Sequence, residues 1–119
     1  MAESNIGGFG YGQVETVGAT KTLDEGDGGV IQNCPVTTTI TLPATVAGTT
    51  YPIRVGADSV TVTVAPNALD KIMGNGFTSA DNKALVFTSQ PVGSYVVLVG
   101  DGTNGWQVSS IHGVATRAA

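Results

Sequence analysis

Strict alternation of β-branched residues with a period of two is the feature that most constrains this chain. The segment 59–64, SVTVTV, puts three valines on one face and serine or threonine on the other, and the segment 36–42, VTTTITL, repeats the pattern. Such alternation is typical of strands that bury one face. The chain holds 16 valines and 16 threonines against 5 leucines, and these β-branched residues suit a pleated sheet better than a helix. We therefore expect an all-β fold.

Turn-forming residues separate the expected strands at regular intervals. They occur at Pro43, at Gly56–Asp58, at Pro91–Gly93 and through the segment 101–105, DGTNG. Strands of this length and spacing predict an antiparallel β-sandwich or a small barrel, jelly-roll-like in type. At 119 residues the chain is one domain's length and can bury a core without disulfides or metal.

Several strand positions carry more detailed expectations. Pro52 cannot donate to a ladder, so its strand is expected at a sheet edge, or Pro52 at the strand start. The segment 94–99, SYVVLV, is apolar on both faces and predicts a central strand covered on both sides. Trp106, Val108 and Ser110 should share one face of the closing strand, with Ile111 on the other. Trp106 is expected to be buried beside segment 94–99.

The N-terminal part of the chain differs in composition from the rest. Residues 1–12 read MAESNIGGFGYG, and the glycines leave this segment little intrinsic reason to fold alone. We therefore divide the chain into an extended glycine-rich N-terminal arm with short strands, 1–33, and a β-sandwich or barrel domain, 34–119. Large apolar side chains in such an arm suit docking on a partner. The expected contact residues of the arm are Ile6, Phe9 and Tyr11.

Charge and cysteine content exclude several classes of function. Five Lys and Arg against nine Asp and Glu give a net charge of −4, without the basic cluster that nucleic-acid binding needs. A single cysteine forms no internal disulfide, and one cysteine with one histidine cannot complete a zinc site. No apolar run approaches the ~20 residues of a membrane helix, and the N-terminus shows no secretory signal. We expect no membrane, no cofactor, and synthesis in a cytoplasm.

Possible catalytic or ligand-binding groups each have a simpler structural explanation. Cys34 and His112 could form a nucleophile and base, but no third orienting group is evident and a lone cysteine is usually a small buried apolar residue. The acidic residues at 24–27 lack a calcium-loop spacing, and a solvated turn is favoured. The glycine-rich segment 8–12 lacks the strand before it and the Lys-Ser/Thr after it that a phosphate loop requires. We therefore expect no enzymatic activity.

The surplus of uncharged polar residues points to protein contacts. A surface of threonine, serine, glycine and asparagine can be buried against a partner without desolvating ions, and interface cores are depleted of charge. Tyr95 and Val97 belong to the strand that is apolar on both faces. They can serve either the core or a subunit interface.

The order of motifs from residue 36 to about 108 resembles that of a known group of domains. These motifs are TITLP (39–43), Gly48 with YPI (51–53), VTVTV (60–64), DKIMG (70–74), VVLV (96–99) and DGTNGWQV (101–108). This order resembles the small β-domains that recur in tailed-bacteriophage virion proteins, both tail fibres and head-decorating proteins.

The resemblance implies a virion structural protein, trimeric and without catalytic residues. One short domain with a glycine-rich arm favours a capsid cement or decoration protein, made in the host bacterial cytoplasm and bound to the major capsid protein on the capsid surface. A tail-fibre or receptor-binding tip, using loops such as 74–82 and 101–105, is the first alternative. A small soluble binding module is the second.

Overall fold

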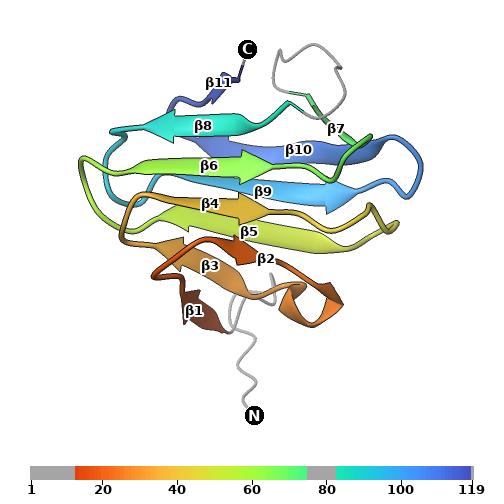
Figure 1. Cartoon of the computed structure of the whole chain (residues 1–119), viewed down its shortest axis with the longest axis horizontal. Helices are drawn as coiled ribbons and strands as arrows, with labels where there is room; N and C mark the ends of the chain where they lie inside the picture. The colour runs from red at the N-terminus through yellow and green to blue at the C-terminus, as the bar shows by residue number, and fades with distance from the viewer. Residues whose placement is uncertain (1–12, 75–82, 119) are drawn as a thin grey trace.

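Two β-sheets face one another in the computed structural model, which describes residues 13–74 and 83–118 (Figure 1). Sheet A has the strand order β1 (Val14–Thr16), β3 (Ile31–Cys34), β5 (Thr50–Val55), β9 (Tyr95–Gly100), β10 (Gly105–His112), β7 (Lys71–Met73). Sheet B has the order β11 (Thr116–Arg117), β8 (Leu85–Thr88), β6 (Thr61–Ala65), β4 (Thr38–Thr41), β2 (Lys21–Thr22). A 3-10 turn, η2 (Glu25–Asp27), joins β2 to β3. The expectation of an all-β sandwich is confirmed.

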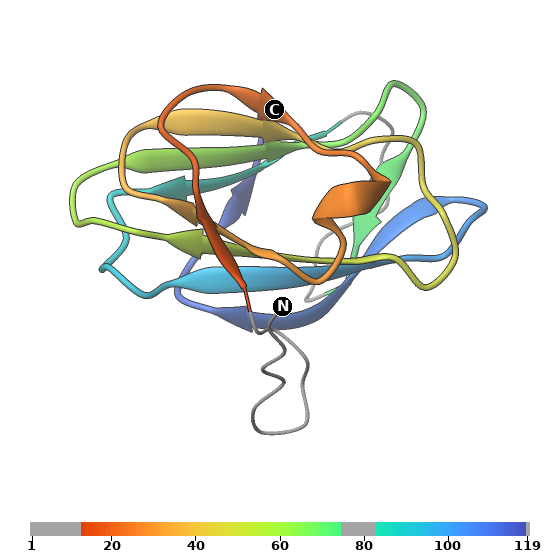
Figure 2. The same ribbon diagram turned by 90° about the horizontal axis from the view of Figure 1, so that it is seen from below.

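The first six strands alternate between the two sheets. In sheet A, β1, β3 and β5 run parallel to one another, and in sheet B so do β2, β4 and β6. The chain therefore winds as a coil, each turn adding one strand to each sheet (Figure 2). Parallel neighbours need a crossover connection, and here the opposite sheet supplies it.

The later strands close this coil with antiparallel pairs. β9 pairs with both β5 and β10, and β8 pairs with both β6 and β11. Both sheets are therefore mixed, and the expectation of a purely antiparallel sandwich was wrong. Alternation along a strand reveals which face is buried, but it is the same in parallel and antiparallel sheets, so it could not reveal strand direction.

The core lies between the sheets and follows the alternation in the sequence. Val62 and Val64 of β6 are fully buried, and so are Tyr51 and Ile53 of β5. The buried apolar cluster comprises Val17, Leu23, Cys34, Ile40, Leu42, Tyr51, Ile53, Val55, Val62, Val64, Ile72, Leu85, Phe87, Val96, Leu98 and Trp106. Trp106 is fully buried next to β9, as expected, with its ring centroid 5.2 Å from that of Tyr51.

Pro52 lies in the middle of sheet A, so its expected edge position was wrong. Gly29 N–H donates to Thr50 O, which shows that even-numbered residues of β5 turn their backbone groups toward β3. The backbone nitrogen of Pro52 is therefore directed toward the start of β3, one residue before the pairing of β3 with β5 begins at Gln32 and Ile53. The Val30 carbonyl at this point accepts a hydrogen bond from the Gln32 side-chain amide (3.3 Å). Proline is tolerated because no full ladder bond is lost.

A β-bulge in β10 changes the expected facing of its residues. The pairing with β9 shifts between Val108 and Ser110, which leaves Ser109 as an extra residue. Trp106 is buried, whereas Ser110 is exposed and lies opposite Val97. Ile111, and not Ser110, packs against the core on the side of Trp106. The expectation that Trp106 and Ser110 share a face was wrong because of this one-residue insertion.

β9 is a central strand as expected, but the described chain covers only one of its faces. Val96 and Leu98 are fully buried, whereas Tyr95 is 37% exposed and Val97 is half-buried. The described residues therefore leave the outward face of β9 partly exposed.

Residues 13–33 take part in both sheets. They contribute β1 and most of β3 to sheet A and β2 to sheet B. The boundary expected between residues 33 and 34 falls inside β3. Residues 1–12, with Ile6, Phe9 and Tyr11, lie outside the described residues. In the described part of the chain, no helix has the length and apolar character needed to cross a membrane.

Candidate interaction face on the outer side of sheet A

The outer face of sheet A carries three cross-strand rows of side chains. These rows follow from the pairing registers of neighbouring strands. The register between β3 and β5 is continued by one residue, which places Ile31 opposite Pro52. The first row is Val14, Ile31, Pro52, Val97 and Ser110. The second is Thr16, Asn33, Arg54, Tyr95 and His112, and the third is Thr50, Val99, Gln107 and Met73. Apolar side chains therefore run across four strands in the first row.

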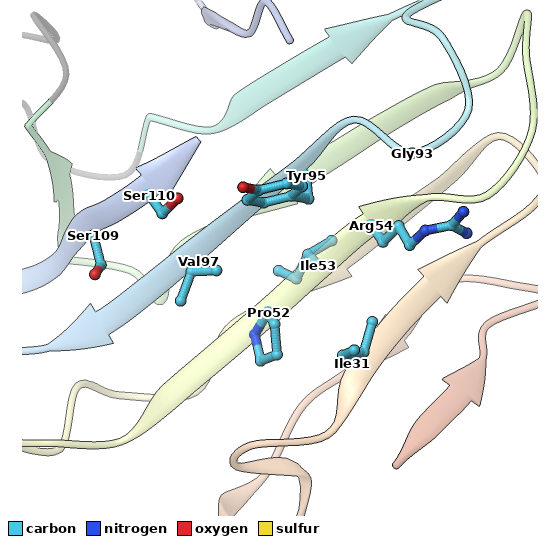
Figure 3. Close-up of a pocket in the computed structure, with 9 residues that line it drawn as sticks. All are labelled: Ile31, Pro52, Ile53, Arg54, Gly93, Tyr95, Val97, Ser109 and Ser110. Atoms are coloured by element: carbon cyan, nitrogen blue, oxygen red, sulfur yellow. The ribbon is translucent and has the colours of Figure 1, made fainter. Parts of the chain in front are cut away.

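A groove of about 470 Å³ lies over the middle of this face. Figure 3 shows its lining, with Pro52 and Val97 side by side on β5 and β9. The groove is lined by Ile31, Pro52, Ile53, Arg54, Gly93, Tyr95, Val97, Ser109 and Ser110. Tyr95 and Val97 lie on β9, and the two serines of the β10 bulge lie beside them on the neighbouring strand (Figure 3). The bulge therefore places hydroxyl groups beside an apolar surface.

Polar residues with fixed partners border the groove. The Arg54 guanidinium donates to the Asn33 side-chain oxygen at 2.5 Å. The rings of Tyr95 and His112 stack, with centroids 5.7 Å apart and planes 19° apart. Arg54 is the one residue of the three rows that is always charged. The face thus combines an apolar centre, an aromatic side chain and a single cation.

Tyr95 and Val97, the candidate interface residues from the sequence, therefore lie on one exposed face. Sequence reasoning did not find the half-buried Ile31 and the buried Pro52, which continue the apolar row across β3 and β5. In the sequence, Tyr51, Ile53 and Val55 alternate with Pro52 and Arg54, which indicates that Pro52 lies on the face opposite to Ile53. The pairing of β5 with β9 was needed to place Pro52 beside Val97.

The outer face of sheet B has a different chemistry. Thr39 lies opposite Thr63, and Thr61 lies opposite Thr88. The outward positions of β2, β4, β6, β8 and β11 are Thr22, Thr39, Thr41, Thr61, Thr63, Ala65, Val86, Thr88 and Thr116. These positions carry no charged side chain.

The structure does not bring Cys34 and His112 together. Cys34 is fully buried in the core, and burial raises the pKa of its thiol to about 11. His112 is exposed on the outer face of sheet A. A thiol that is protonated at neutral pH and faces the core is a poor nucleophile.

The acidic turn at 24–27 takes part in an internal ion-pair network. Asp24 caps η2 by accepting from the Gly26 backbone N–H, and Asp27 accepts in turn from the Asp24 backbone N–H. The Asp27 carboxylate lies 3.2 Å from Lys21 Nζ. Lys21 also contacts Glu15 at 2.6 Å and the buried Gln32 at 3.2 Å. Within residues 13–74 and 83–118, no group of three or more His, Cys, Asp or Glu side chains could hold a metal ion.

This network shifts the pKa values of its members. Burial alone would lower the pKa of Lys21, but its hydrogen bonds to Glu15 and Asp27 outweigh burial and raise it. Burial alone would raise the pKa of Asp27, but hydrogen bonds from the Asp24 backbone and from Lys21 lower it. Burial and the nearby acidic charges raise the pKa of Tyr51, whose hydroxyl donates to the Asp24 carbonyl. The hydrogen bond from the buried Tyr51 therefore links the turn to the core.

The 101–105 loop is a hairpin connection, as expected, held by one carboxylate. Asp101 Oδ1 accepts from the backbone N–H groups of Thr103, Asn104 and Gly105 at 2.7–3.0 Å. These hydrogen bonds, led by the one from Gly105, lower the pKa of Asp101 to about 2. Gly105 also abuts the backbone of Lys71, where a Cβ would collide. These contacts account for the loop without a ligand.

Comparison with known proteins adds no relative. No protein family matches the chain, and no curated protein and no solved structure matches it at a significant level.

Proposed function

We propose that this chain is a non-enzymatic structural protein of a bacteriophage virion, a cement or decoration protein that binds the outer capsid surface and stabilises the shell, as a trimer. The observation that carries the proposal is the apolar row across the outer face of sheet A, from Val14 to Val97. Exposed apolar patches on a small domain mark interaction sites. The order of motifs between residues 36 and 108 supports the phage assignment.

In this proposal the face around Tyr95 and Val97 forms the contact between subunits. Charge is sparse there, and an aromatic side chain lies next to an apolar floor, which suits an interface core. Ile6, Phe9 and Tyr11 of the arm contact the major capsid protein. Contacts that are individually weak become strong when symmetry repeats them over a shell.

The first test counts copies of the protein in purified particles of the source phage. Quantitative gel densitometry against the major capsid protein should give a ratio of one or a simple fraction. A few copies per particle would instead indicate a tail fibre or receptor-binding tip. Absence from particles would contradict a virion function and favour a soluble binding module.

The second test addresses the arm on capsids. A chain that lacks residues 1–12 should keep the circular dichroism spectrum of the β-sandwich but co-sediment less with capsids stripped of this protein. Glu3→Gln, which keeps the length of the arm, is the matched control. Equal co-sedimentation of the full and truncated chains would overturn the role of the arm.

The third test addresses the subunit contact. Val97→Arg should reduce the trimer fraction on capsids, measured by chemical cross-linking. Thr63→Arg, at an outward position of sheet B, should leave that fraction unchanged. An unchanged trimer fraction in Val97→Arg would exclude sheet A as the interface.

A further inference from the structure

We propose that the N-terminal segment of the same chain, residues 1–12, occupies the groove on the outer face of sheet A when the protein is free. The groove opens on the outer face of sheet A and is lined mostly by apolar side chains, among them the half-buried Val97 and the buried Pro52. The segment and the groove are adjacent in the molecule, matched in length and matched in chemistry. Contact within one chain is independent of the proposed capsid function.

The first argument is where the segment meets the fold. Gln13 is the first described residue, and its carbonyl accepts from the backbone N–H of Ile31 at 3.0 Å. Ile31 lines the groove. The next residue, Val14, is 63% exposed and begins the apolar row of that face. The N-terminal segment therefore joins the fold at the edge of the groove.

The second argument is reach. From β1 to β10 there are four strand spacings, or about 19 Å at ~4.8 Å each. Twelve extended residues span at most about 40 Å. Counted back from Gln13 at ~3.4 Å per residue, Phe9 can extend about 14 Å and Ile6 about 24 Å. Val97 lies three strand spacings from β1, about 14 Å, which equals the reach of Phe9. The serines of β10 lie about 19 Å away, so Ile6 can reach them with about 5 Å left for a turn.

The third argument is chemistry. The segment offers three large side chains for an apolar floor, Ile6, Phe9 and Tyr11, separated by glycines that let a backbone approach closely. Its one charged side chain is Glu3, and the always-charged residue of the facing rows is Arg54. Serine hydroxyls at 109 and 110 can pair with backbone groups of an extended segment.

Attachment within one chain favours this occupant over a second copy. A short linker that can span its site gives an effective concentration in the millimolar range. At protein concentrations well below millimolar, a weak contact therefore forms within one chain, whereas the same contact between two chains does not form. If the proposed function holds, binding of the arm to a capsid also uncovers Tyr95 and Val97 for the subunit contact, so trimers form on the shell.

The experiment places a nitroxide spin label on Ser4→Cys in the otherwise intact chain. Cys34 is fully buried and remains unlabelled, which labelling of the parent chain verifies. Proton relaxation of backbone amides is measured by NMR. We expect the enhancement of amide-proton relaxation by the nitroxide to be several-fold larger at Val97 and Ser110 of sheet A than at Thr39 and Thr63 of sheet B. Equal enhancement on the two sheets would overturn the proposal.

Two further measurements identify the occupant. Phe9→Ser should reduce the enhancement at Val97 several-fold, whereas the matched change Asn5→Ser should not. A mixture of ¹⁵N protein without label and spin-labelled protein at natural abundance should show no enhancement at Val97. Enhancement in that mixture would assign the groove to a second copy and contradict the contact within one chain. All samples are free protein, so failure of the capsid tests leaves this result unaffected.

Discussion

Lys21 Nζ lies 2.6 Å from Glu15 Oε1, and this ion pair joins the two sheets because Glu15 belongs to β1 and Lys21 to β2. The same ammonium group reaches Asp27 and the buried Gln32. One lysine therefore ties together sheet A, sheet B and the turn η2. The contact closes the end of the sandwich where the coil of strands begins.

We expect Lys21→Met to lower the free energy of unfolding by about 1–2 kcal/mol at pH 7. An exposed pair contributes about 0–1 kcal/mol, and Glu15 is partly exposed, but Gln32 also loses a donor in a buried position. Urea denaturation measures the change. Lys83→Met removes a positive charge elsewhere and should lower the free energy of unfolding by less than about 0.5 kcal/mol, the usual limit for a surface substitution. Equal effects of the two changes would show that the network contributes nothing.

The contribution of this network should depend on pH in a defined direction. The pKa of Asp27 is lowered in the folded state, so its stabilisation is fully present above its ordinary value of 3.8 and is lost as pH falls through the folded value. The pKa of Lys21 is raised, so its contribution is lost only as pH rises above 10.5. The difference between the parent chain and Lys21→Met should therefore persist from pH 5 to about 9 and shrink below about pH 4.

Thr38→Val should make the protein more stable. The Thr38 side chain is buried in β4, and its hydroxyl has no hydrogen-bond partner among the described residues. Valine keeps the β-branched shape and removes the buried hydroxyl, a gain of about 1 kcal/mol. Thr39→Val, one residue along and facing outward, should change stability by less than about 0.5 kcal/mol. Destabilisation by Thr38→Val would indicate that a water molecule satisfies this hydroxyl.

Trp106→Ala should lower the free energy of unfolding by about 3–5 kcal/mol, the range for removing a buried aromatic side chain. Trp106 is fully buried and packs on Tyr51. Its indole N–H has no partner among the described residues, so Trp106→Phe loses volume but no hydrogen bond and should cost less. Chemical denaturation followed by far-ultraviolet circular dichroism measures both. A cost below about 1 kcal/mol for Trp106→Ala would contradict its place in the core.

Asp101→Asn should lower the melting temperature at pH 7 by a few degrees, because the asparagine amide cannot match a carboxylate as acceptor for three backbone N–H groups. The pKa of Asp101 is lowered to about 2, so its stabilisation is present above pH 3.8 and is lost between about pH 4 and 2. Thermal melts of the two proteins should therefore converge in that interval. Parallel curves down to pH 2 would show that the carboxylate does not hold the loop.

The Cys34 thiol should resist alkylation in the native protein at pH 8. It is fully buried, and its pKa is raised to about 11, so the reactive thiolate is scarce. Iodoacetamide labelling followed by mass spectrometry should show modification only after denaturant is added. Rapid labelling of the native chain would mean that the core opens around β3.

The sequence by itself determined the strands and their buried faces, because alternation at 51–55 and 59–64 depends only on which side chains avoid water. It could not determine which strands become neighbours. That decision came from tertiary pairing, which set β3 and β5 parallel, placed Pro52 at the centre of a sheet and inserted a bulge at Ser109. The face around Val97 exists for the same reason: its residues come from strands far apart in the chain, and only their register aligns them.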